Sequence, residues 1–133
     1  MTIVVDCSVV VAWCFPDELS PLANRAFERM AKEQAIAPAL LWYEIRNALH
    51  VGERRQRLSA DRSDAFLERV DRLGISFEPQ AASPPLMRLA RRHSLSVYDA
   101  CYLELALRTG ALLSTLDRQL AVAARSEGVE LTA

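Results

Sequence analysis

The residues Ile3-Val4-Val5-Asp6-Cys7-Ser8 are the part of the sequence around which the rest of the chain is organised. Three apolar residues lead directly into a carboxylate, and an apolar helical stretch, Val9 to Phe15, follows Ser8. A strand without polar alternation is typical of a parallel sheet that is buried on both faces. Open α/β sheets bind ligands at the carboxyl ends of their strands, so Asp6 lies at a candidate ligand site. It could also serve only as the amino-terminal cap of the next helix.

Short apolar runs alternate with helical patterns along the chain, which indicates an α/β fold with a mainly parallel sheet. The predicted strands are Thr2–Val5, Ala35–Ala37, Ile75–Glu78 and Leu112–Ser114, with Val129–Leu131 as a candidate edge strand. The predicted helices run from Ser8 to the residue before Pro16, from Pro21 to Lys32, from Leu40 to Gln56, from Ser59 to Arg72, from Pro84-Pro85 to His93, from Val97 to Arg108 and from Asp117 to Glu127. No repeat or long linker divides the sequence, so residues 1–133 are expected to form a single domain.

Composition favours one cytoplasmic domain. The overall charge does not by itself indicate that the domain binds nucleic acid. The 133 residues are 51% hydrophobic, and 16 basic residues balance 17 acidic ones, so any nucleic-acid binding must come from local patches. The three cysteines are an odd number without a Cys-x-x-Cys pair, which favours reduced thiols in a cytoplasmic protein. The early apolar run is too short to span a membrane.

Glu44 lies on or beside the inward stripe of the predicted Leu40–Gln56 helix, next to Leu41 and Ile45. Burying an unpaired charge is costly, so this carboxylate needs a partner. An arginine could supply an ion pair, or a metal ion could bind there. Asn47 follows one turn later and is a candidate supporting residue.

Asp99 and Asp117 also have two interpretations each. Asp99 falls in the first turn of a helix, where the helix dipole alone favours an acid. Asp117 follows the strand Leu112–Ser114 and could be only a cap. However, Asp6 and Asp117 follow strands, and Glu44 and Asp99 lie early in helices, so all four are expected at the same edge of the sheet.

Grouped carboxylates without a cationic side chain must share protons or bind a metal. Lys32 is the only lysine, and it accompanies none of the four acids. An all-oxygen site suits Mg²⁺ or Mn²⁺. Ser8 and Thr115, each two residues from a site aspartate, are candidates to orient ligands or water.

The chain resembles the PIN-domain ribonucleases, and most closely the VapC-type toxins of bacterial type II toxin–antitoxin systems. The matching stretches are Ile3-Val-Val-Asp-Cys-Ser-Val-Val-Val, Ala37-Pro-Ala-Leu-Leu-Trp-Tyr-Glu-Ile-Arg-Asn-Ala-Leu49, Leu95-Ser-Val-Tyr-Asp-Ala-Cys-Tyr-Leu-Glu-Leu-Ala106 and Leu113-Ser-Thr-Leu-Asp-Arg-Gln-Leu120. They run in order from one end of the chain to the other.

The resemblance implies a three-layer α/β/α fold with a four- or five-stranded sheet. It implies that Asp6, Glu44, Asp99 and Asp117 form a catalytic Mg²⁺ site, with Ser8, Asn47 and Thr115 as supporting residues. It also implies RNA cleavage that inhibits translation and growth, a homodimer, and neutralisation by a small antitoxin.

Two arginine clusters are candidate RNA contacts, because substrate affinity must come from local positive charge. The first contains Arg54, Arg55 and Arg57 with Arg62, and the second contains Arg88, Arg91 and Arg92. Either cluster could instead be a solvated helix face.

Two other classes compete with a nuclease. A phosphotransfer domain is also built around a strand-end aspartate, but it needs a lysine at the phosphoryl group, and Lys32 lies at the end of an outer helix. A non-catalytic interaction module would have no reason to keep four acids in this arrangement.

Overall fold

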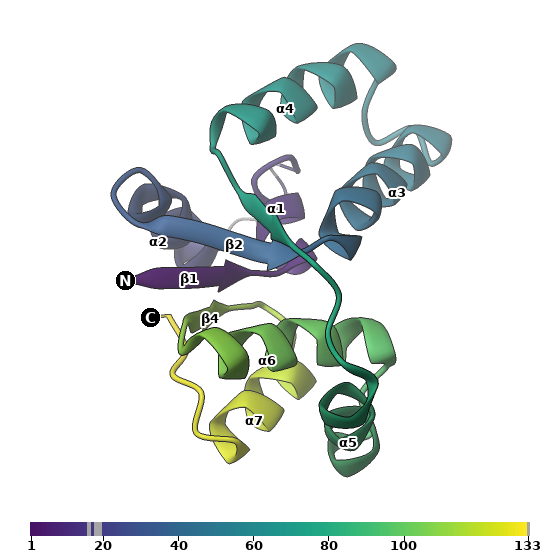
Figure 1. Ribbon diagram of the computed structural model, residues 1–133. Coiled ribbons are helices and arrows are strands. Elements are labelled where there is room, and N and C mark those ends of the chain that lie inside the picture. The colour runs from purple at the N-terminus through teal and green to yellow at the C-terminus, as the bar shows by residue number, and fades with distance from the viewer. Residues whose placement is uncertain (16, 18–19, 133) are drawn as a thin grey trace.

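A computed structural model describes residues 1–15, 17 and 20–132 (Figure 1). Its centre is a four-stranded parallel sheet in the order β3-β2-β1-β4. The strands are β1 (Thr2–Val5), β2 (Gln34–Pro38), β3 (Ser76–Glu78) and β4 (Leu112–Ser114). Val5 is the register partner of Ser114, so the residues that follow β1 and β4 emerge side by side. This pairing brings Asp6 near the segment that leads to Asp117.

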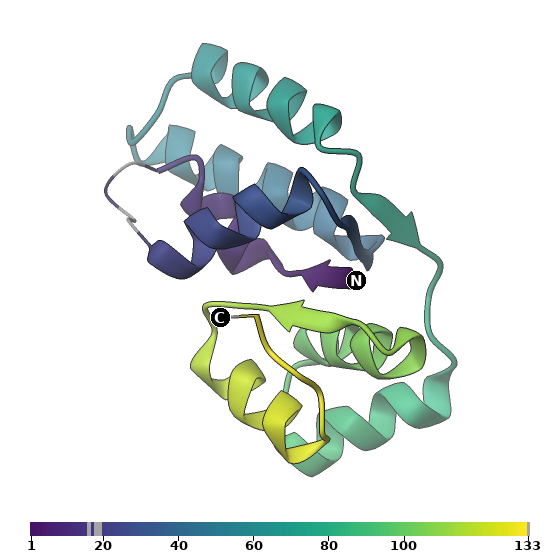
Figure 2. The ribbon, with the colours of Figure 1, turned by 90° about the vertical axis from the view of Figure 1, so that its left-hand side faces the viewer.

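The helices of the described chain are α1 (Cys7–Ala12), α2 (Pro21–Met30), α3 (Leu40–Arg54), α4 (Ala60–Arg72), α5 (Ser83–His93), α6 (Val97–Thr109) and α7 (Arg118–Ser126). Two views at right angles show α1 to α4 on one side of the sheet and α5 to α7 on the other (Figures 1 and 2). This is the division that right-handed crossovers produce for this strand order. The predicted three-layer α/β/α fold is therefore confirmed, with four strands.

The predicted elements differ from the observed ones mainly at their ends. The first helix stops at Ala12, short of the residue before Pro16, and α2 stops at Met30. Helix ends are the least regular part of a helix, and single residues there carry little energy. The candidate edge strand at Val129–Leu131 is reduced to one parallel bridge, between Leu131 and Leu113.

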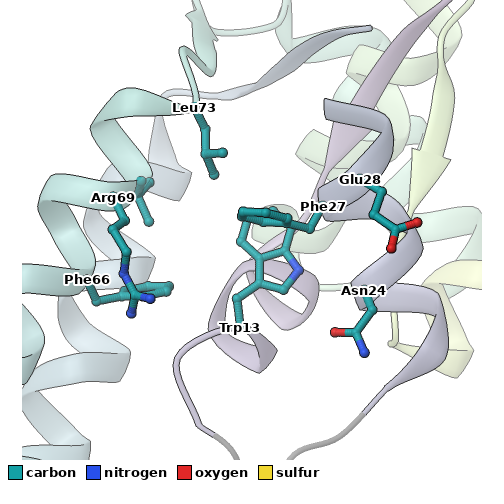
Figure 3. Close-up of a pocket in the computed structure, with 8 residues that line it drawn as sticks. Trp13, Asn24, Phe27, Glu28, Phe66, Arg69 and Leu73 are labelled. Carbon is teal, nitrogen blue, oxygen red and sulfur yellow. The ribbon is translucent and has the colours of Figure 1, made fainter. Parts of the chain in front are cut away.

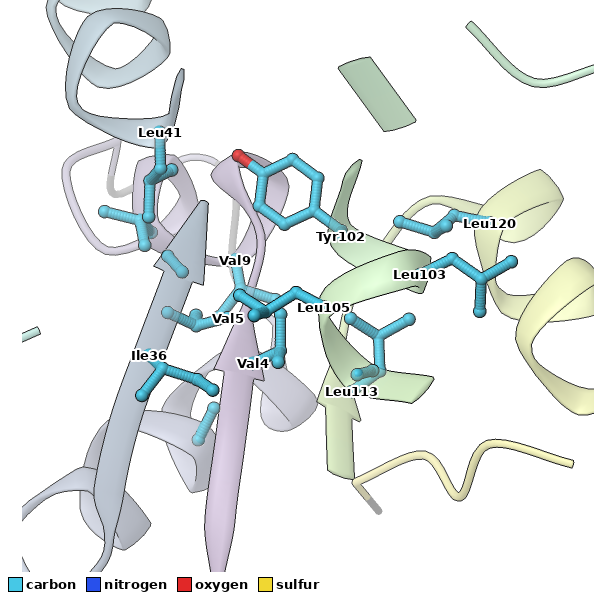
Figure 4. Packing of buried hydrophobic residues seen from close by; sticks show 14 of the residues in the cluster. Val4, Val5, Val9, Ile36, Leu41, Tyr102, Leu103, Leu105, Leu113 and Leu120 are labelled. Atoms are coloured by element: carbon cyan, nitrogen blue, oxygen red, sulfur yellow. The ribbon is translucent and has the colours of Figure 1, made fainter. Parts of the chain in front are cut away.

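The core is built on the apolar strand that opens the chain. Ile3, Val4 and Val5 are completely buried, as the continuous apolar run predicted. Each buried valine side chain contributes about 1.5–3 kcal/mol. Figure 4 shows these valines packed against Leu105 of α6 and Leu113 of β4.

Helix α6 is buried on more sides than a surface helix, because it lies on the sheet and also contacts α5 and α7. Consecutive residues from Tyr102 to Ala106 are buried as a result. By three-and-four spacing Leu107 would share an inner stripe with Ala100 and Leu103, but it is exposed. Nowhere in the described residues is there a helix long and apolar enough to cross a membrane.

Candidate metal centre

Asp6 is the most buried of the predicted acids and lies directly after β1. Its Oδ1 accepts hydrogen bonds from Ser8 Oγ at 2.6 Å and from the Val9 backbone N–H at 3.2 Å. The Thr115 hydroxyl donates to its Oδ2. Burial raises the pKa of Asp6, these three hydrogen bonds oppose the rise, and the charge of Asp117 adds to it. Asp6 therefore caps α1 and also presents a carboxylate at the sheet edge.

Asp117 occupies the corresponding position after β4. Its Oδ1 caps α7 by accepting from the backbone N–H groups of Gln119 at 2.9 Å and Leu120 at 3.2 Å. Its own backbone N–H donates to Thr115 Oγ1 at 3.0 Å. Ser8 Oγ likewise accepts from the Leu116 backbone N–H at 2.9 Å. The two predicted hydroxyl residues thus connect the end of β1 to the loop after β4.

Glu44 projects from the first turns of α3 and is partly buried. Its partner is a tyrosine, because the Tyr102 hydroxyl on α6 donates to Glu44 Oε1. Burial raises the pKa of Glu44, the Tyr102 hydrogen bond opposes the rise, and the charges of Asp99 and Asp6 add to it. Arg46, the nearest arginine in sequence, instead stacks 3.5 Å from the centre of the Trp42 ring and donates to the Trp42 carbonyl.

Asp99 lies in the first turn of α6, but the cap of that helix is Ser96. Ser96 Oγ accepts from the Asp99 backbone N–H at 3.0 Å. Burial raises the pKa of Asp99, and the charge of Asp117 raises it further. The Asp99 carboxylate is therefore not needed to cap its helix and is available to a ligand.

The charges of neighbouring acids raise the pKa values of Asp6, Glu44 and Asp99. Asp117 raises the pKa of Asp6 and of Asp99, while Asp6 and Asp99 both raise the pKa of Glu44. Within the described residues, no lysine or arginine is among the groups that shift these pKa values. Lys32 precedes β2 and so lies at the opposite, amino-terminal edge of the sheet. The sequence prediction of like charges at one edge agrees with this arrangement.

These residues fit a hard divalent cation by their chemistry, although they are not gathered into a closed ligand set. Across the described positions, no three histidine, cysteine or acidic side chains are arranged as a preformed metal cage. Internal hydrogen bonds hold one or both oxygens of Asp6, Glu44 and Asp117. The neighbouring Cys7 has its pKa raised to about 12, by burial and then by Glu44 and Asp6. It stays a neutral thiol, which leaves an oxygen donor set of the kind that Mg²⁺ prefers.

Asn47, the third predicted supporting residue, is exposed on α3. Its side chain makes no hydrogen bond within the described part of the chain, so its supporting role stays a prediction. Tyr102 was missed as a functional candidate. The spacing could have found it, since Asp99 and Tyr102 are three residues apart and therefore lie on the same side of a helix.

The arginines do not gather around the acids. Arg57 pairs with Asp17 at 3.1 Å, and Arg62 donates to the Cys14 carbonyl at 3.3 Å. Arg88 and Arg92 lie 3.8 and 3.6 Å from the carboxylate of Glu127. Arg54, Arg55 and Arg91 are exposed, and none has an acidic partner among the residues described. Among the described residues, no internal ion pair therefore offsets the charges of these three side chains.

A cavity of about 420 Å³ lies between α1, α2 and α4 (Figure 3). Trp13 and Phe27 pack edge to face there with ring centres 5.3 Å apart. Phe27 is 48% exposed at this position. None of the four acids lines the cavity, so it is separate from the acidic site.

The chain is thus a small α/β/α domain with a parallel sheet and a group of acidic side chains at the carboxyl edge of that sheet. It belongs to the class of α/β domains that have an acidic ligand site. Within that class, the family model described as the PIN domain matches residues 3–126, and the chain belongs to this family. Ribonuclease VapC3 of Pyrobaculum aerophilum is 35% identical over 124 residues, which cover 91% of this chain and 93% of the relative. The chain is therefore of the VapC type.

A solved structure has the same fold. The crystal structure of PAE2754 from Pyrobaculum aerophilum superposes with a TM-score of 0.73 and 23% identity, covering 94% of this chain and 81% of that one. The likeness supports the fold assigned above.

Proposed function

We propose that this chain is a Mg²⁺-dependent endoribonuclease, with Mn²⁺ as a substitute, that acts as the toxin of a toxin–antitoxin pair. The observation that carries the proposal is the set of four acids beside the paired ends of β1 and β4, where Thr115 connects Asp6 to Asp117. The ribonuclease name of the VapC3 relative supports RNA as the substrate. Residues 1–133 act as one nuclease domain in this proposal.

Each acid has a role in the proposed hydrolysis. Asp6 and Asp99 would anchor the principal cation, and Glu44 and Asp117 would hold it directly or through water. A divalent cation bound there would lower the pKa of a water molecule and neutralise charge on the phosphate. One carboxylate of the set would take the proton of that water. The products would carry a 5′-phosphate and a 3′-hydroxyl.

Arginines outside internal ion pairs are the proposed contacts to the RNA backbone. Arg54 and Arg55 lie at the end of α3, ten residues or about 15 Å along the helix from Glu44. Arg91 lies in the last turn of α5. Arg57, Arg88 and Arg92 are weaker candidates, because each already has an acidic partner.

The proposed partners are a small cognate antitoxin and a second copy of the chain, and the proposed location is the cytoplasm. RNA cleavage would inhibit translation and growth until the antitoxin neutralises the toxin. The exposed rings of Trp42 and Tyr43 on α3 offer apolar surface that a homodimer could cover. Sedimentation analysis of the purified chain tests the dimer.

Cleavage of RNA by an Asp6→Asn variant tests the proposed activity. The variant keeps side-chain oxygen and shape at the α1 cap, so the fold should persist while cleavage with Mg²⁺ is lost. Asp71→Asn, which neutralises an exposed carboxylate on α4, is the matched control and should cleave normally. Full cleavage by the folded Asp6→Asn protein would overturn the proposal.

A further inference from the structure

Tyr102 connects the hydrophobic core to the acidic site. Its side chain is 1% exposed, and its hydroxyl donates a hydrogen bond to Oε1 of Glu44. Figure 4 shows the ring packed among the core residues, with the hydroxyl oxygen pointing away from α6. Burial, followed by the hydrogen bond to Glu44, raises the pKa of Tyr102 far above its ordinary value of 10.0. The buried ring therefore fixes the direction in which the hydroxyl donates its hydrogen bond to Glu44.

The hydrogen bond from Tyr102 makes the two carboxylate oxygens of Glu44 unequal. Oε1 is held by Tyr102, whereas Oε2 receives no hydrogen bond from the described residues. The carboxylate oxygens of Asp117 are also unequal. Its Oδ1 accepts hydrogen bonds from two backbone N–H groups, whereas its Oδ2 accepts none from the described residues. Two acids from different elements thus each have one oxygen held internally and one oxygen left for a ligand.

We propose that Tyr102 is a positioning residue that restricts Glu44 to one-oxygen contact with a divalent cation, and that it thereby favours Mg²⁺ over Ca²⁺. The inference rests on the proposed metal site. Mg²⁺ requires a tight octahedral shell and is usually bound through single carboxylate oxygens. Ca²⁺ is larger, takes about six to eight ligands and readily accepts both oxygens of one carboxylate. A Glu44 with Oε1 held by Tyr102 suits the first ion better than the second.

The Tyr102→Phe substitution isolates this hydrogen bond, because it keeps the buried ring and removes the hydroxyl. Glu44 would then be free to turn and offer both oxygens. We expect the dissociation constant for Mg²⁺ to rise about tenfold, the lower end of the usual effect of losing such a supporting contact. The dissociation constant for Ca²⁺ should stay unchanged or fall.

The experiment titrates the full chain, stripped of metal by EDTA, with MgCl₂ or CaCl₂ in a calorimeter without RNA. Tyr98→Phe is the matched control, since it removes an exposed hydroxyl one turn earlier on the same helix. Glu44→Asp is a second variant that leaves the core intact but shortens the carboxylate away from the Tyr102 hydroxyl. Tyr102→Phe and Glu44→Asp should both lower the preference for Mg²⁺, and Tyr98→Phe should not.

A double variant excludes a general effect on the core. In a Glu44→Gln background, adding Tyr102→Phe should leave the ratio of the two dissociation constants unchanged. If the unaltered chain binds Mg²⁺ but Tyr102→Phe changes both dissociation constants by the same factor, or neither, the role of Tyr102 is wrong. If the unaltered chain binds neither cation, the metal site itself is wrong and the inference falls with it.

Discussion

The hydroxyl of Thr115 donates a hydrogen bond to Oδ2 of Asp6, which joins residues 109 positions apart in the sequence. The same hydroxyl oxygen accepts from the backbone N–H of Asp117. One small side chain therefore connects two of the four acids. The contact is possible because Val5 and Ser114 are register partners at the ends of adjacent parallel strands.

Replacing Thr115 by valine should remove both interactions while nearly preserving the side-chain volume. The expected loss of stability is about 1.5–3 kcal/mol at neutral pH, the usual value of a hydrogen bond to a charged group. RNA cleavage should also decrease, because Asp6 is no longer held from two sides. Thr115→Ser keeps the hydroxyl and should restore most of both properties. Equal urea-denaturation midpoints for the valine and serine variants would contradict the role of this hydroxyl.

Neutralising Asp99 should stabilise the metal-free protein. The folded-state pKa of Asp99 lies above its ordinary value of 3.8, so the folded chain binds the proton more tightly than the unfolded chain. Stability is therefore lost as the pH rises from about 3.8 through the raised pKa. An Asp99→Asn protein does not lose stability in this way, because its side chain does not ionise. Its melting temperature in EDTA should exceed that of the unaltered chain at pH 7, and the difference should vanish at low pH.

Added Mg²⁺ should reverse that order, because a ligand that binds the folded state stabilises it. The unaltered chain should gain more in melting temperature from Mg²⁺ than Asp99→Asn does. A variant that is less stable than the unaltered chain in EDTA at pH 7 would show that the acids do not repel one another as described.

The parts of this site that the sequence predicted are those that depend on local pattern. The run Ile3-Val4-Val5 predicts a buried parallel strand, and a parallel strand fixes where Asp6 must lie. Strand ends and helix starts placed the other acids at the same edge. Spacing places Tyr102 on the same side of its helix as Asp99, but its hydrogen bond to Glu44 could not be predicted, because the two residues lie 58 positions apart and meet only through packing across the sheet. The exposure of Leu107 has a similar cause, since the position of α6 between three neighbours changes which of its faces is buried.

Glu127 should stabilise the chain at neutral pH through contacts with α5. Its Oε2 lies 2.6 Å from His93 Nε2, and this hydrogen bond, helped by Arg92 and Arg88, lowers the pKa of Glu127 below 4.5. Glu127→Gln should cost about 1 kcal/mol at pH 7, because the arginine partners are solvent-exposed.

The cost should shrink as the pH falls below 4.5 through the lowered pKa, since a depressed acid pKa contributes stability only above that range. Glu68→Gln, at an exposed acid on α4, is the control. The melting temperatures of both variants should be measured from pH 3 to pH 7, which spans about four units around the ordinary carboxylate pKa. A constant difference across this range would contradict the assigned contact.

The arginines without acidic partners should contribute more to RNA binding than the paired ones. Arg54→Ala with Arg55→Ala should weaken binding and reduce the slope of log affinity against log salt by about one for each lost phosphate contact. Arg88→Ala with Arg92→Ala should have a smaller effect, because Glu127 already offsets those charges. Filter binding of a single-stranded RNA over a salt series checks this order. An equal loss in the two double variants would exclude it.

The decisive experiment maps the RNA ends produced by the purified chain, with Asp99→Asn as the control. With Mg²⁺ present, the unaltered chain should yield internal cuts that carry a 5′-phosphate and a 3′-hydroxyl. EDTA should abolish the cuts, and the folded Asp99→Asn protein should make none. Equal cleavage by Asp99→Asn, or cleavage that persists in EDTA, would contradict a metal-dependent nuclease built on these four carboxylates.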